Sequence, residues 1–155
     1  MFFVGAFITN VKTIDVTCIF EVQEGGLYGC KVEHLIYGNQ TEEIVIVGDH
    51  ESGKTNDDVL AIYLFSANFE VLVFPSKLFQ IFPNIEEFFL QDNRVGAIKV
   101  GDLVGAKLRR LEMSGNRVTL IENGAFQDAP NIEIVDLAGK FLLYCKCIDF
   151  IIFNF

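Results

Sequence analysis

The residues best suited to chemistry form one loop, residues 48–55 (GDHESGKT), which fits the pattern GxxxxGK[ST] in full. In this pattern, backbone N–H groups hold phosphate oxygens, a lysine neutralises their charge and a threonine hydroxyl binds magnesium. The loop also follows an apolar run, residues 44–47, as a phosphate-binding loop should follow a strand. A candidate nucleotide-binding site would therefore consist of Gly48, Gly53, Lys54 and Thr55.

Asp136 adds to this possibility, because residues 136–139 read DxxG and resemble the magnesium-side motif of GTPases. Other features argue against it. Asp49 and Glu51 would place negative charge beside the phosphates, and residues 56–58 favour a turn where a helix should begin. No [NT]KxD guanine motif is present. We keep a P-loop nucleotide-binding protein as an alternative and expect a polar connecting loop.

Other signatures of catalysis are missing from the sequence. There is no GxSxG and no HExxH, and the two histidines are isolated from each other. The four cysteines form no CxxC pair and have no histidine at zinc-ligand spacing. We therefore expect no enzymatic activity, no cofactor and no metal site.

Composition limits the possible partners. The chain has 155 residues, of which 51% are hydrophobic and 21% charged, so we expect one packed domain. The net charge is −9 and the 12 basic residues are scattered, which argues against a nucleic-acid partner and an anionic membrane surface. No run of about 18 apolar residues is present, so we expect no membrane span.

A repeat runs through the middle of the chain. Residues 85–93 (IEEFFLQDN) and 108–116 (LRRLEMSGN) both read LxxLxLxxN if Ile, Phe and Met stand for Leu. A third copy begins at Ile132 and a looser one begins at Val59, so the four starting positions are almost evenly spaced. Repeats with such a spacing predict a stack of similar coils.

The apolar pattern of each copy predicts a short strand with one buried face, because side chains alternate along a strand. Phe88 and Leu90 in one copy, and Leu111 and Met113 in the next, should point inward. Asn93 and Asn116 should turn the chain, with their side-chain amides bonded to backbone groups inside the coil. The third copy has Lys140 at this position, and Asn68 of the looser copy falls one place late. Each coil buries its apolar face only against its neighbours, so we expect stability to come from stacking.

Periods of roughly 23 to 26 residues with this pattern resemble the leucine-rich repeat family over residues 59–137, about half of the chain. The resemblance implies an α/β solenoid with a parallel concave β-sheet. Before the repeats, Cys18 and Cys30 flank a segment that reads as a small hairpin, and residues 43–47 read as a further strand. This arrangement looks like the N-terminal cap of secreted leucine-rich repeat proteins of flies and midges. That resemblance implies a Cys18–Cys30 disulfide.

The chain therefore divides into a signal-like leader (1–17), an N-terminal cap (18–58), the repeats (59–137) and an apolar tail (138–155) that is atypical of a solenoid end. We expect the chain to be a fragment, with a fuller signal lost upstream and the tail read from an intron. The sequon Asn39-Gln40-Thr41 lies between two apolar strands, where a loop could carry a glycan.

In the leucine-rich repeat fold, the residues between the inward positions face a partner from the concave side. The predicted ligand-binding residues are Tyr63, Phe65, Glu87, Phe89, Gln91, Arg110 and Glu112. Exposed aromatic residues beside arginine make good binding anchors, although these aromatics could instead pack against the cap or a second chain. We expect an extracellular recognition or scaffold module with a protein ligand. A self-associating structural matrix component is the other alternative.

Overall fold

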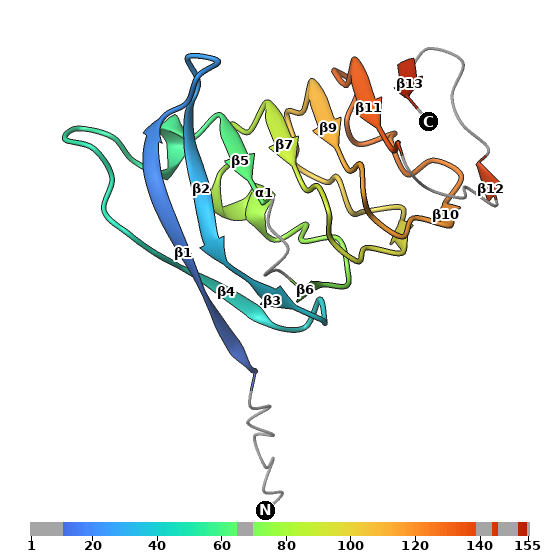
Figure 1. Cartoon of the computed structure of the whole chain (residues 1–155), viewed down its shortest axis with the longest axis horizontal. Coiled ribbons are helices and arrows are strands. Elements are labelled where there is room, and N and C mark those ends of the chain that lie inside the picture. Colours follow the sequence, from blue (N-terminus) through green and yellow to red (C-terminus); the bar gives the residue numbers. More distant parts are fainter. Residues whose placement is uncertain (1–10, 65–69, 139–143, 146–151, 155) are drawn as a thin grey trace, which may run out of the picture.

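The computed structural model describes residues 11–64, 70–138, 144–145 and 152–154 of the chain (Figure 1). These residues form an eight-stranded sheet in the order β13-β11-β9-β7-β5-β2-β1-β4, a three-stranded sheet β12-β10-β8 and a two-stranded sheet β3-β6. The strands are β1 (Thr13–Val22), β2 (Tyr28–His34), β3 (Ile36–Tyr37), β4 (Glu43–Val47), β5 (Ala61–Tyr63), β6 (Glu70–Val71), β7 (Glu87–Phe89), β8 (Ala97–Ile98), β9 (Arg110–Glu112), β10 (Leu120–Ile121), β11 (Ile134–Asp136), β12 (Tyr144–Cys145) and β13 (Ile152–Asn154).

The cap is a hairpin with a third strand beside it. β1 and β2 pair antiparallel, and β4 pairs parallel to β1. Alternate residues of β1, among them Val16, Cys18 and Phe20, are buried, because side chains alternate between the two faces of a strand. A disulfide joins Cys18 to Cys30 inside the cap, as the resemblance implied. The strand begins at Thr13, so the last residues of the leader segment 1–17 belong to the sheet of the cap.

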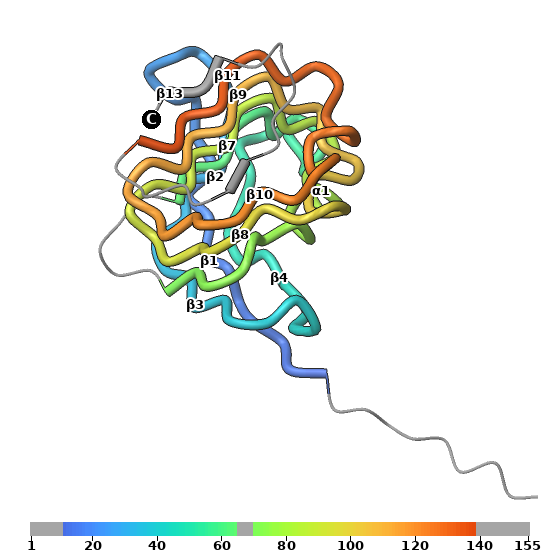
Figure 2. Tube along the Cα trace, turned by 90° about the vertical axis from the view of Figure 1, so that its right-hand side faces the viewer, coloured from blue at the N-terminus to red at the C-terminus, as the bar shows by residue number. Residues whose placement is uncertain are grey.

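The repeats stack in the register that the sequence predicts. Phe88 lies beside Leu111 in the parallel pair β7–β9, and these residues hold the same position in their two copies. The pair β9–β11 places Leu111 beside Val135, and the pair β5–β7 places Ile62 beside Phe88, so the third and the loose copy are also in register. Figure 2 shows the successive coils lying over one another. The expected inward residues are all completely buried: Phe88, Leu90, Leu111 and Met113.

Asparagine side chains close the coils from the inside, as expected. The buried Asn116 amide donates to the carbonyl oxygens of Leu90 and Met113, and its oxygen accepts the N–H of Val95. Asn93 donates in the same way to two carbonyl oxygens, at 2.9 and 2.8 Å. These bonds satisfy backbone groups that no strand partner reaches, so one amide side chain fixes the turn in each of these two coils.

The expected α/β class is wrong. Within the described ranges, helix is limited to a 3₁₀ turn, η1 (Asn56–Asp58), and one α-helical turn, α1 (Leu78–Ile81). The main sheet is also mixed and not parallel throughout, because β1 and β2 pair antiparallel. The structure is a solenoid built mostly of strands, and no helix in its described part is long and apolar enough to cross a membrane.

Short strands and turns replace the expected helices because the return segments favour them. Residues 95–106 hold three glycines and three valines, which have low helix propensity. Gly101 and Gly105 adopt φ of 91° and 80°, a left-handed conformation that ends a helix. Part of the apolar tail pairs with the solenoid as well, since β12 and β13 lie parallel to β10 and β11. The other tail residues lie outside the described ranges.

Candidate binding face

The main sheet has an outer face, opposite the core, along which side chains form rows. Strand pairing places Lys31, Tyr63, Phe89, Glu112 and Asp136 next to one another in one row across five strands. Tyr63, Phe89 and Glu112 are among the ligand-binding residues that the sequence predicts. Lys31 extends the row into the cap, so the outer face is continuous from the hairpin into the repeats.

A hollow of about 660 Å³ opens on this face where the hairpin meets the repeats. Figure 1 shows the turn between β1 and β2 standing beyond the ends of the neighbouring strands. The cap lines the hollow with Glu21 and Lys31 among others, and the repeats line it with Tyr63, Phe89 and Arg110. The hollow is therefore made jointly by the two parts of the chain.

Two stacked aromatic rings lie in this hollow. The centroids of Tyr63 and Phe89 are 4.8 Å apart with 9° between the ring planes. This contact follows from strand pairing, because neighbouring residues on the same face of a sheet lie within about 5 Å of each other. Both rings are half-buried. Phe65, the third aromatic residue predicted for this surface, lies outside the described residues.

Arg110 lies against one of the two aromatic rings. Its guanidinium carbon lies 5.6 Å from the centre of the Phe89 ring, within the range of a cation–π interaction. Its Nε also donates to Glu112 at 2.8 Å, and this hydrogen bond raises the pKa of Arg110. Glu112 is only 5% exposed, because Arg110 and Gln91 lie against its carboxylate. Glu112 therefore holds Arg110 in place, and direct contact of Glu112 with a ligand stays a prediction.

The Tyr63 phenol is uncharged near neutral pH. Burial raises its pKa, and the negative charge of Glu87 raises it further. An uncharged phenol beside a fixed guanidinium offers both a flat apolar surface and polar groups to a ligand.

The loop with the P-loop pattern is tied to the cap. Lys54 lies 3.3 Å from a carboxylate oxygen of Asp58 and 5.4 Å from the centre of the Tyr28 ring. Thr55 forms a capping box with Asp58 at the start of η1, which has only three residues. Gly48 and Gly53 adopt φ of 140° and 80°.

Asp136, the residue that resembled a magnesium ligand, does not form a site with Lys54 and Thr55. Asp136 lies on β11, three strands away from β5 in the sheet, and its carboxylate accepts the N–H of Ala138 at 2.8 Å. The Asp58 carboxylate accepts hydrogen bonds from the side chains of Lys54 and Thr55. No long helix follows these two residues in the described part of the chain. These contacts do not favour the nucleotide-binding alternative.

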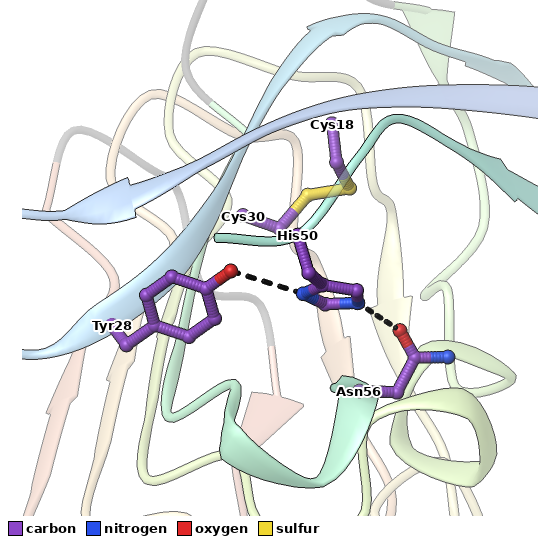
Figure 3. The surroundings of a disulfide bond; sticks show 5 residues. All are labelled: Cys18, Tyr28, Cys30, His50 and Asn56. Carbon is purple, nitrogen blue, oxygen red and sulfur yellow. Dashed lines mark hydrogen bonds between the residues drawn. A yellow bond between two sulfur atoms is a disulfide. The ribbon is translucent and has the colours of Figure 1, made fainter. Parts of the chain in front are cut away.

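His50 anchors the same loop next to the disulfide (Figure 3). Its Nδ1 lies 3.0 Å from the Tyr28 hydroxyl and its Nε2 lies 2.8 Å from the Asn56 amide oxygen. Its ring stacks on Phe20 with 3.8 Å between centroids. The histidine therefore holds the connection between cap and repeats in place.

The sequence did not identify the contribution of the cap to the binding face. Glu21 and Lys31 line the hollow, yet they belong to no repeat and no motif. The hairpin pattern indicated strands here, but only the pairing of β2 with β5 brings Lys31 beside Tyr63. Among the residues that the structure describes, no group of three or more His, Cys, Asp or Glu side chains could hold a metal ion.

Comparison with known proteins provides no assignment. No protein family matches the sequence, and no curated protein is significantly similar to it.

Proposed function

We propose that this chain is an extracellular protein-binding module of the leucine-rich repeat family, and that it has no catalytic role. The protein ligand binds the outer face of the sheet. The hollow between hairpin and repeats supports this proposal most strongly, because it presents stacked Tyr63 and Phe89 rings beside Arg110. Aromatic and arginine side chains supply most of the binding energy in protein interfaces.

Two further features support the family and the location. Coils of nearly constant length, with an inward asparagine at the turn, are typical of leucine-rich repeats, and a cap covers the first coil. The cap resembles that of secreted proteins of flies and midges. A buried disulfide between Cys18 and Cys30 fits a protein that folds in an oxidising compartment.

The test begins with the chain secreted from insect cells behind a heterologous signal peptide. The purified protein is then screened for direct binding to a panel of purified extracellular domains. We expect a ligand whose affinity falls by roughly thirtyfold in Phe89→Ala, since a central aromatic anchor contributes about 2 kcal/mol or more. Leu120→Ala is the matched control, because Leu120 is 37% exposed on a different sheet.

The possible results of this experiment distinguish the proposal from its alternative. A ligand that binds the wild type and Leu120→Ala equally, but not Phe89→Ala, supports the proposal. Equal affinity of all three proteins contradicts binding through the hollow. Magnesium-dependent binding of ATP or GTP that is lost in Lys54→Ala would support the nucleotide-binding alternative instead.

A self-associating matrix component is the second candidate, and the edge of the main sheet favours it. β4 is the last strand in the sheet order, and Val45 and Val47 are 46% and 44% exposed on it. An edge strand without lysine or proline can pair with another chain. Sedimentation at increasing protein concentration should then show a dimer that Val45→Lys abolishes. A monomer at all concentrations would exclude this candidate.

A further inference from the structure

The sequon lies on a well-fixed turn between β3 and β4. Asn39 and Thr41 are both exposed, and the Asn39 side-chain oxygen accepts the N–H of Thr41 at 3.0 Å. The buried carboxylate of Glu42 accepts the N–H groups of Gly38 and Asn39, and Lys12 binds it at 2.7 Å. Among the described residues, no hydrogen bond involves the amide nitrogen of Asn39, the atom to which an N-linked sugar is attached.

A groove of about 380 Å³ begins at this asparagine. Asn39 and Gln40 line it together with Leu72 and Ala97, which come from the segments that return between the main strands. Leu72 is 46% exposed, although it is large and apolar. The groove therefore includes an apolar residue open to solvent, and the sequon contributes to its lining.

The groove also has polar groups at fixed positions. Asp102 is 5% exposed, and its two carboxylate oxygens accept the Gln40 side-chain amide at 2.9 Å and the Lys99 N–H at 2.7 Å. The Gln40 bond links the turn to a segment far away in the sequence. The Lys99 side chain lines the same groove. Rigid walls of mixed polarity suit a ligand with one apolar face and several hydroxyl groups.

We propose that Asn39 carries an N-linked glycan and that its first N-acetylglucosamine ring lies in this groove. The C–H face of the ring packs on Leu72 and Ala97, while its hydroxyl and acetamido groups reach Lys99 and Gln40. This inference rests on the proposed function in one respect only, because the chain must enter the secretory pathway to be glycosylated. The groove lies on a different part of the molecule from the hollow, so the glycan leaves the binding face open.

The attachment is a group transfer from an oligosaccharide that is linked to a lipid diphosphate, catalysed by the host transferase. The Asn39 amide nitrogen forms a bond to the anomeric carbon of the first sugar. The bond between that carbon and the diphosphate oxygen breaks, the amide nitrogen loses one proton and the lipid diphosphate leaves. No redox partner is required.

The experiment uses the chain secreted from insect cells behind a heterologous signal peptide, so native secretion is not a condition of the test. We compare wild type, Asn39→Gln and Leu72→Asp on gels before and after glycosidase treatment. Glycosidase should shift wild type and Leu72→Asp but not Asn39→Gln. Hydrogen–deuterium exchange is then measured on wild type and on Leu72→Asp, each with the glycan trimmed to one sugar and each fully deglycosylated.

We expect the single sugar to slow exchange in residues 72–74 and 96–99 of the wild type, and this protection should be lost in Leu72→Asp. Absence of a glycosidase shift in secreted wild type would overturn the modification. A shift without slower exchange in these segments would overturn the placement of the sugar in the groove. Both results are independent of ligand binding at Phe89, so failure of this inference is distinct from failure of the proposed function.

Discussion

The cap and the repeats are stabilised in different ways. Different, unrelated contacts hold the cap together: one disulfide, an antiparallel hairpin and the bonds of His50. The repeats use the same contacts again in each coil, with Phe88, Leu111 and Val135 stacked in one row. Loss of one contact should therefore act locally in the cap and spread to neighbouring coils in the repeats.

The hollow that we propose as the binding site lies at the boundary between these two regions. Glu21 and Lys31 come from the cap, and Tyr63, Phe89 and Arg110 come from the repeats. The regular stack places side chains in rows at constant spacing. The hairpin, which belongs to no repeat, adds further lining residues to the hollow. The specificity of the module should therefore depend on the cap as well as on the repeats.

The largest effect should follow from a cavity in the stack. Leu111 is completely buried in β9, between the coils that contain Phe88 and Val135. Leu111→Ala should lower the free energy of unfolding by about 2–5 kcal/mol, measured by urea denaturation. The unfolding of both neighbouring coils should become easier, which hydrogen exchange would show.

Arg109→Ala is the control for this variant. Arg109 precedes the same strand, is exposed and pairs with Glu133 at the surface. A surface ion pair adds little to stability, so the urea midpoint should stay near that of the wild type. Equal loss in both variants would contradict the view that stacking stabilises the repeats.

Removal of the disulfide should have the next largest effect, but a local one. The bridge closes a loop with a sequence separation of 12 residues. Its loss in the double variant Cys18→Ala/Cys30→Ala should cost about 2–4 kcal/mol. Hydrogen exchange should increase in β1 and β2 while β9 and β11 keep their protection. A uniform increase along the chain would show that cap and repeats unfold as one unit.

Loss of the asparagine side chain at the turn of a coil should lower the free energy of unfolding less than loss of the Leu111 side chain. Asn116→Ala removes the side-chain donor to the Leu90 carbonyl and the side-chain acceptor of the buried Val95 N–H. The expected cost is about 1–3 kcal/mol, measured by urea denaturation. Asn116→Asp should be no better, because a carboxylate cannot donate to this carbonyl. Wild-type stability of either variant would show that the amide is dispensable.

The smallest effect should be a change in pH dependence at the groove. Burial raises the pKa of Asp102, so the folded chain binds this proton more tightly than the unfolded chain does. Stability should therefore increase as the pH falls from the raised pKa toward the ordinary value. Asp102→Asn should weaken this dependence, measured as urea midpoints from roughly pH 4 to 7. An unchanged slope would contradict the role of Asp102.

The sequence predicted the regular part of the fold well. The strand register, the inward residues such as Phe88 and Leu111, and the asparagine bonds all follow from one repeating pattern. The strand Glu43–Val47 was also predicted with its observed bounds. These features are local or periodic, so composition and spacing are enough to reveal them.

Features that depend on contacts between distant segments were not predictable in this way. The expected helices came from a family resemblance, while the glycines and valines of residues 95–106 favour turns and short strands. The burial of Glu112 and the place of Lys31 beside Tyr63 arise only after the strands pair. The outward-facing residues of the repeats could therefore be predicted, but the contribution of the hairpin to the hollow could not.

The most direct test of binding at this boundary is hydrogen–deuterium exchange of the chain with and without the ligand found in the binding screen. We expect slower exchange at residues 21–25, which include the end of β1 and the start of the hairpin turn, and at β5, β7 and β9, with no change in β8 and β10. Protection confined to β8 and β10, or to residues 48–55, would contradict the proposal that the outer face and the hairpin form the binding site.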